Sequence, residues 1–222
     1  MNLDEVRALP RASMYALMVK DLLKDMGSHA ATVLHAALGI SGEAGETIPA
    51  VIRDDFPNMV EELGDGLFYA QGLLNMFGWT LEEMLETIAS GDDQDLIDDF
   101  LQSPGAGMVY YASNIIDEVK KTWAYNKEMN VPALKYSLGM YYRMLEETLS
   151  EWDLTFDDIE AHNQNKLVSG PNARYPSGKY SDAAAQARAD KAESPNLPGL
   201  PAWPSSPAVE GNPPFIVTGN GA

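Results

Sequence analysis

The 222-residue sequence contains no cysteine, which excludes both a disulfide framework and thiolate chemistry. Basic residues are scarce as well, because 15 Lys and Arg stand against 33 Asp and Glu for a formal net charge of −18. Binding a nucleic-acid backbone requires Lys and Arg to displace its counterions, so this balance argues against a nucleic-acid partner. It fits an acidic protein that recruits cations.

Long apolar segments are also missing. No run of about 18 apolar residues is uninterrupted, so the sequence predicts no membrane-spanning helix and no membrane partner. The N-terminus carries Asp4, Glu5 and Arg7 and lacks the apolar core of a signal peptide. Together with the absence of cysteine, this predicts a cytoplasmic protein.

Helical signals dominate to about residue 165. Apolar residues recur at helical spacing over residues 11–37, with a break at Gly27 and with Ser28 as the predicted N-cap of the next helix. Pro49 predicts a kink or an early end of that helix, because its ring clashes with the carbonyl four residues back. Further helices are predicted from Pro57 or Asn58 to about Phe77, over 81–89, over about 108–128 and 132–151, and from Thr155 to about Lys166.

Two pairs of carboxylates lie within these predicted helices, Glu43 with Glu46 and Glu62 with Asp65. Residues three apart share one face of a helix, so each pair points in a single direction. Both pairs lie among apolar and small residues, where unpaired anions are costly to bury. Two facing helices would gather four mutually repelling carboxylates, which require divalent cations among them. Oxygen-only ligands suit Mg²⁺, for which Mn²⁺ can substitute.

The alternative for these pairs is a solvated helix face, where acidic residues at this spacing are common. Glycines flank both pairs, however, and each lowers helix stability by about 1 kcal/mol relative to alanine. Close approach of two backbones, or of a ligand, would explain why they are tolerated, and this favours a site. The glycines are Gly42, Gly45, Gly64 and Gly66.

These residues also carry a family resemblance. HAALGISGEAGE at 35–46 and EELGDGLFY at 61–69 resemble the ExxE…ExxD signature of the MazG-like all-α nucleoside triphosphate pyrophosphohydrolases. That group is related to dimeric dUTPases and dCTP pyrophosphatases. NQNKL at 163–167 and RYPSGKY at 174–180 resemble its closing NxxKL…RYPxGF pattern, although the spacing between the two motifs is wider than usual.

The resemblance implies an all-α helical bundle that hydrolyses nucleoside triphosphates to the monophosphate and pyrophosphate with Mg²⁺. All four carboxylates would bind metal, and either Glu43 or Glu46 would be the catalytic general base. Purine deoxynucleotides in a phage-type nucleotide metabolism, within the host cytoplasm, are one expected substrate class. The residues that would contact the substrate are Tyr69, Asn163, Lys166, Arg174 and Lys179. A base pocket is expected to be lined by Met14, Met18, His35 and Trp79.

Other functions stay open at this point. A dUTPase or dCTPase of the same superfamily is one alternative, and a non-catalytic acidic helical binding protein is another. A ferritin-like di-iron oxidase would need Glu-x-x-His pairs, and the sequence has none.

The region between residue 90 and the NxxKL motif resembles a faded copy of the first hairpin. An offset of 75 lays residues 79–84 on 154–159, and Glu43 on Glu118. The other three carboxylates, Glu46, Glu62 and Asp65, fall on Lys121, Ser137 and Met140, so the copy would have lost its metal. The alternative is two unrelated amphipathic hairpins that end in a similar capping box.

The expected organisation is an all-α domain over 1–180, with a metal-bearing half at 11–90 and a degenerate repeat at 108–166. Residues 181–222 are expected to form a short helix, capped by Asp182, and then an extended Pro/Gly-rich tail. A homodimer or higher oligomer is expected unless the second hairpin replaces a partner subunit and completes a four-helix core.

Overall fold

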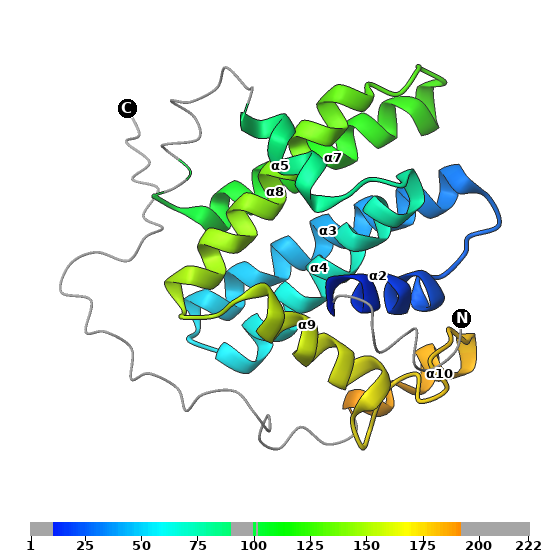
Figure 1. Cartoon of the computed structure of the whole chain (residues 1–222), viewed down its shortest axis with the longest axis vertical. Helices are drawn as coiled ribbons and strands as arrows, with labels where there is room; N and C mark the ends of the chain where they lie inside the picture. Colours follow the sequence, from blue (N-terminus) through cyan, green and yellow to red (C-terminus); the bar gives the residue numbers. More distant parts are fainter. Residues whose placement is uncertain (1–10, 90–99, 101, 192–222) are drawn as a thin grey trace, which may run out of the picture.

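The computed structural model describes residues 11–89, 100 and 102–191, and within these ranges all regular secondary structure is helical (Figure 1). The predicted all-α fold is therefore confirmed. The extended tail from residue 194 and the segment after residue 90 lie outside the described residues. No described helix combines the length and the apolar character needed to cross a bilayer. The elements are α2 (Arg11–Leu22), α3 (His29–Ile52), α4 (Phe56–Phe77), α5 (Leu81–Ala89), α7 (Pro104–Tyr125), α8 (Val131–Glu151), α9 (Phe156–Gln164), the π-helical turn η1 (Asn165–Ser169), α10 (Asp182–Ala187) and the 3-10 turn η2 (Ala189–Lys191).

Side-chain caps fix where several helices begin. The Ser28 hydroxyl accepts a hydrogen bond from the Ala31 amide at 3.2 Å, so the predicted cap of α3 is confirmed. The Thr80 and Glu83 side chains form the predicted capping box at α5, each accepting from the other's backbone amide. These bonds satisfy amides that have no partner within the first turn of a helix.

The predicted early end of α3 at Pro49 and the predicted cap of α10 are wrong. Helix α3 does not end early at Pro49 but runs through it to Ile52. Ala44, Thr47 and Ala50 are buried along this part of α3, and this packing outweighs the helix-breaking cost of proline, about 3 kcal/mol. At α10 the N-cap is Ser181, whose hydroxyl accepts from the Ala184 amide, and not Asp182.

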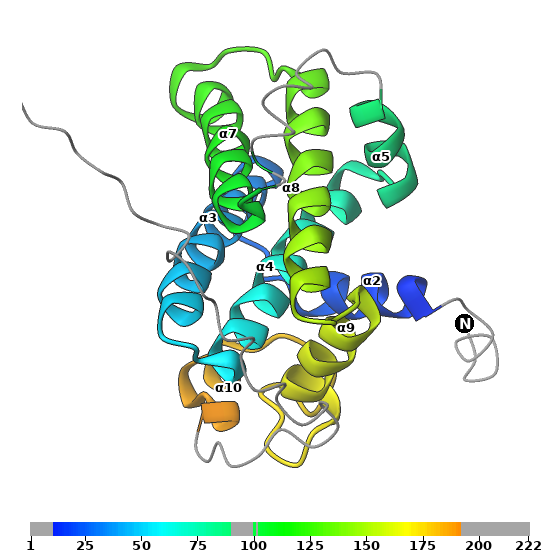
Figure 2. The ribbon, with the colours of Figure 1, turned by 90° about the vertical axis from the view of Figure 1, so that its left-hand side faces the viewer.

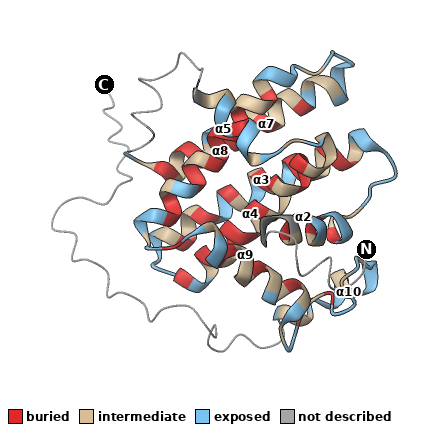
Figure 3. Cartoon of the chain, in the orientation of Figure 1, coloured by how far each residue is buried: buried red, intermediate tan, exposed pale blue. Residues whose placement is uncertain are grey.

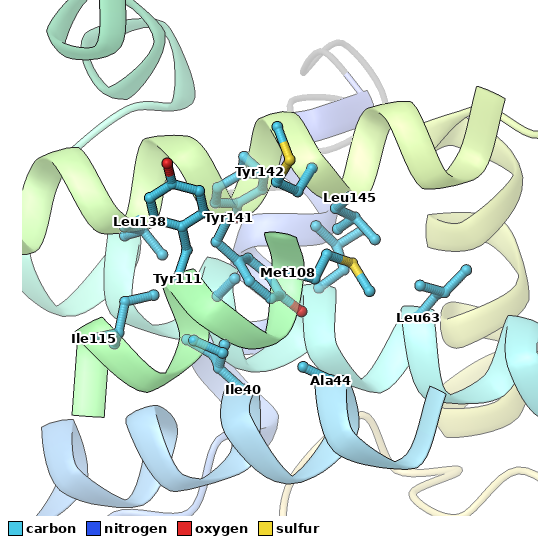
Figure 4. Packing of buried hydrophobic residues seen from close by; sticks show 14 of the residues in the cluster. Ile40, Ala44, Leu63, Met108, Tyr111, Ile115, Leu138, Tyr141, Tyr142 and Leu145 are labelled. Carbon is cyan, nitrogen blue, oxygen red and sulfur yellow. The ribbon is translucent and has the colours of Figure 1, made fainter. Parts of the chain in front are cut away.

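Helices α3 and α4 form one antiparallel hairpin and α7 and α8 form a second, and α7 packs against α3 (Figures 1 and 2). The buried faces of the four helices turn toward one another (Figure 3). Ile40 of α3, Leu63 of α4, Ile115 of α7 and Leu138 of α8 meet in this core (Figure 4). The two hairpins therefore share a single four-helix core.

The helices of the second hairpin begin at an offset of 75 residues from those of the first. Helices begin at His29 and Pro104, at Phe56 and Val131, and at Leu81 and Phe156, and each pair is 75 apart. The N-cap positions follow the same offset: Ser28 and Ser103, Asp55 and Asn130, Thr80 and Thr155.

The helix that follows each hairpin packs against the other hairpin. α9 packs against α4 of the first half, while α5 packs against α8 of the second half. A Cβ on Gly64 would lie 3.5 Å from Ile159, and a Cβ on Gly139 would lie 2.7 Å from the Met84 carbonyl oxygen. Both glycines and both of their neighbours are 75 residues apart, so a glycine faces the crossing helix at the same position in each hairpin, more tightly at Gly139 than at Gly64.

Candidate metal and phosphate site

Three carboxylates from the first hairpin converge. Glu43 of α3 and Glu62 and Asp65 of α4 each offer an oxygen, and these atoms all lie within 4.8 Å of one another. Glu62 is buried, with 7% of its surface exposed, and the other two are half-buried. Such a set of hard oxygen donors matches the ligands that Mg²⁺ and Mn²⁺ prefer.

A missing side chain on α4 allows the Tyr141 hydroxyl of α8 to approach closely beside the cluster. A Cβ on Gly66 would lie 3.6 Å from the Glu43 Cβ and 2.5 Å from the Tyr141 hydroxyl of α8. Close helix approach therefore explains Gly66, whereas an added Cβ on Gly64 would make only ordinary contacts with α9. Close approach does not explain Gly42 and Gly45, where an added Cβ would meet nothing within 4 Å.

The three carboxylates repel one another when no divalent cation is present. Burial raises the pKa of Glu43 to about 9, and a hydrogen bond with Glu62 and the charge of Asp65 add to this effect. Burial also raises the pKa of Glu62. The free cluster must therefore hold a proton, and a divalent cation would allow all three groups to ionise. The residues present thus fit a metal ion.

A lysine from the end of the chain closes the cluster on one side. The Lys166 ammonium lies 2.5 Å from Asp65 Oδ2 and 2.8 Å from Glu61 Oε1, and only 8% of its side chain is exposed. Burial acts to lower the pKa of Lys166, but the charges of Asp65 and Glu61 outweigh it and raise that pKa. Lys191 also pairs with Glu61, at 2.6 Å.

Asn163 holds the other oxygen of the same aspartate. Its amide donates to Asp65 Oδ1 at 3.0 Å, and its own oxygen accepts from the Tyr15 hydroxyl at 3.1 Å. Asn163 lies near the end of α9 and is fully buried. The π-helical turn η1 follows directly and presents Lys166, so one short segment fixes both oxygens of Asp65.

The carboxylate cluster lies in a segment that matches a known protein family. The model of the MazG nucleotide pyrophosphohydrolase domain matches residues 31–90, which include Glu43, Glu62 and Asp65. Residues 31–90 are similar to a MazG domain. Searches of curated proteins and of solved structures each found no match. The predicted family is confirmed. The predicted enzyme class, nucleoside triphosphate pyrophosphohydrolase, is confirmed with it. Members of this family depend on a metal.

The matched segment ends before the second hairpin. Residues 104–191, which contain Asn163 and Lys166, therefore lie outside the family match although they contact the carboxylates of the matched segment. The family comparison alone does not find these two residues.

Three of the predicted site residues lie apart from the converging carboxylates. Glu46 is exposed and does not join the group of three. Arg174 forms a two-pronged ion pair with Asp190, at 2.7 and 2.5 Å. Lys179 is 75% exposed, and its nearest carboxylate is Asp21, at 3.9 Å.

Tyr69 lies beside the carboxylate cluster. Its ring covers Gly39, where an added Cβ would lie 2.4 Å from ring carbons, and its edge meets the His35 ring at 5.6 Å. Burial raises the pKa of the Tyr69 hydroxyl to about 12, and the charge of Glu43 adds to the effect. The hydroxyl therefore stays protonated at neutral pH as a hydrogen-bond donor.

Sequence reasoning missed several residues of this arrangement. Glu61 is four residues before Asp65 and so shares its helix face, a signal that was available in the EELGD motif. Tyr15, Tyr141 and Lys191 reach the site only through the tertiary fold, and no motif indicates them.

A separate cavity of about 860 Å³ lies between α2, the start of α3 and the end of α4. Of the four residues expected to line a base pocket, Trp79 alone lines this cavity. Its polar lining residues are Lys20, Asp25, His29, Thr32 and Asn75.

Proposed function

We propose that this protein hydrolyses deoxynucleoside triphosphates to the monophosphate and pyrophosphate at the Glu43–Glu62–Asp65 cluster. The observation that carries the proposal is the convergence of three carboxylate oxygens within 4.8 Å inside the MazG match. A cluster that must hold a proton when empty suits a site that binds Mg²⁺ together with an anionic substrate.

Glu43, Glu62 and Asp65 would hold the metal. When bound, Mg²⁺ supplies positive charge beside the phosphates and makes a water molecule more acidic. Lys166 and Asn163 keep Asp65 in one orientation, since each contacts a different oxygen of that carboxylate. Outer contacts of this kind orient the ligands of metal sites.

Glu46 is the residue we assign as general base. It follows Glu43 by one helical turn, on the same face, and stays outside the group of three that would bind metal. In the reaction, water attacks the α-phosphorus, Glu46 takes its proton, and the bond to the bridging oxygen breaks as pyrophosphate leaves. Catalysis then depends on positioning and electrostatics.

The remaining predicted contacts would act on the phosphates and the sugar. The protonated Tyr69 hydroxyl can donate a hydrogen bond to a phosphate or sugar oxygen. Arg174 shares its charge with Asp190, and Lys179 stands in solvent, so both would contribute less than Lys166. Purine deoxynucleotides of a phage-type metabolism are the substrates we favour, with dUTP and dCTP as the alternatives.

Pyrophosphate release from each common ribo- and deoxynucleoside triphosphate, dUTP included, tests activity and base preference together. We expect Mg²⁺-dependent release from deoxynucleotides. Glu62→Gln and Asp65→Asn should abolish both release and Mn²⁺ binding, while Glu46→Gln should abolish release and keep Mn²⁺ binding. Glu82→Gln, on the exposed face of α5, is the matched control and should change neither.

A non-catalytic acidic helical protein would behave differently. It would release no pyrophosphate from any nucleotide, and Mg²⁺ would not shift its melting temperature. That pair of results would reject the proposed function.

A further inference from the structure

The second half of the chain has a pocket of its own. It has a volume of about 300 Å³ and lies between α7 and α8. Glu118, Lys121 and Ser137 are among its lining residues. At the offset of 75 that relates the two hairpins, these positions correspond to Glu43, Glu46 and Glu62 of the first half. The pocket is therefore the second-half counterpart of the carboxylate cluster.

One carboxylate of the counterpart is retained and is largely covered. Glu118 has 16% of its side chain exposed. Its partners have changed, because Ser137 and Met140 stand where Glu62 and Asp65 stand in the first half. Asp117 adds a second carboxylate to the lining of the pocket. The corresponding residue of the first half is Gly42.

A lysine neutralises these two acids. The Lys121 ammonium lies 2.8 Å from Glu118 Oε1 and 2.7 Å from Asp117 Oδ2. In the first half the same position is Glu46, which follows Glu43 by one helical turn. The charge at this position is therefore negative in the first half and positive in the second.

We propose that the Lys121 ammonium takes, in the second half, the place that a divalent cation takes in the first half. This inference rests on the proposed metal role of Glu43 and Glu62. The described part of the chain then has one metal centre, and Glu118 is kept in a covered position without a metal. The second hairpin packs against the first in the shared core and carries no metal chemistry.

Manganese binding to the full chain, followed by electron paramagnetic resonance and calorimetry, tests the proposal. Lys121→Glu combined with Ser137→Glu and Met140→Asp restores the acids of the first half and should add one class of Mn²⁺ sites. Lys121→Met alone should lower the melting temperature without metal, and Mn²⁺ should recover it. Lys120→Met is the matched control: Lys120 pairs with Asp117 at 2.7 Å but does not line the pocket, so Mn²⁺ should give no such recovery.

Two further variants keep the inference separate from the proposed function. The Glu118→Gln variant should bind as much Mn²⁺ as the wild type does. The Glu62→Gln/Asp65→Asn double variant should bind none. Mn²⁺ binding that survives in the latter variant but is lost with Glu118→Gln would overturn the role of Lys121. A folded Lys121→Glu/Ser137→Glu/Met140→Asp variant that gains no Mn²⁺ would overturn it as well. Absence of Mn²⁺ binding to the wild-type chain would instead reject the proposed function.

Discussion

The Asn163 amide donates a hydrogen bond to Asp65 across 98 residues of sequence, and through it α9 orients a carboxylate of α4. Asn163→Ala removes this bond and leaves the Tyr15 hydroxyl without its acceptor. We expect Mn²⁺ affinity and kcat/KM to fall by about 10- to 100-fold, as for other residues that orient metal ligands. Calorimetry and pyrophosphate release measure the two quantities.

The control for this prediction is Asn172→Ala, because Asn172 is exposed in the same C-terminal segment. It should behave as the wild type. An Asn163→Ala protein with unchanged Mn²⁺ affinity would show that Asp65 does not need this contact.

Lys166 stabilises the metal-free site by neutralising Asp65 and Glu61. Lys166→Met leaves both acids without that ammonium, although Lys191 still pairs with Glu61. We expect the free energy of unfolding without metal to fall by about 1–3 kcal/mol, the range for a covered polar group that loses its partner. Urea unfolding with and without Mg²⁺ measures this, and Mg²⁺ should offset most of the loss.

Lys179→Met is the comparison for Lys166→Met, because Lys179 is exposed and 3.9 Å from its nearest carboxylate. It should change the free energy of unfolding by no more than about 0.5 kcal/mol. An equal loss in both variants would mean that general charge balance, and not the local contact, is responsible.

The sequence predicts best what neighbouring residues determine. Ser28 and Thr80 were found because a cap and its helix are adjacent in the chain, and the convergence of Glu62 with Asp65 because helical spacing fixes their common face. The end of α3 was missed at Pro49 because burial against other helices outweighs a local preference. The partner of Arg174 was missed because Asp190 is 16 residues away and belongs to no motif.

The titration of Glu43 predicts a pH dependence for the metal-free protein. Its pKa is raised from an ordinary value of 4.5 to about 9, because of burial first and then its contacts with Glu62 and Asp65. A raised pKa stabilises the fold fully below about pH 4.5, and this contribution is lost as the pH rises toward 9. The free energy of unfolding without metal should therefore fall over that interval, and saturating Mg²⁺ should flatten the dependence.

The same shift predicts that metal binding releases a proton near pH 7. Calorimetric titration with Mn²⁺ in buffers of different ionisation enthalpy counts the protons released. Glu43→Gln removes the group and should abolish both the release and tight Mn²⁺ binding. Equal binding enthalpies of the wild type in all buffers would contradict a protonated cluster.

The glycines beside the carboxylates should respond oppositely to alanine. A Cβ on Gly66 would lie 2.5 Å from the Tyr141 hydroxyl, which is buried, so Gly66→Ala should lower the free energy of unfolding by about 1–3 kcal/mol. Gly45→Ala meets no atom within 4 Å in the interior of α3 and should raise it by up to about 1 kcal/mol. Thermal and urea unfolding compare the two variants.

Adding Tyr141→Phe to Gly66→Ala removes the clashing oxygen and should recover part of the loss. If Gly66→Ala were instead as stable as the wild type, close approach of α4 and α8 would not be the reason for glycine at this position.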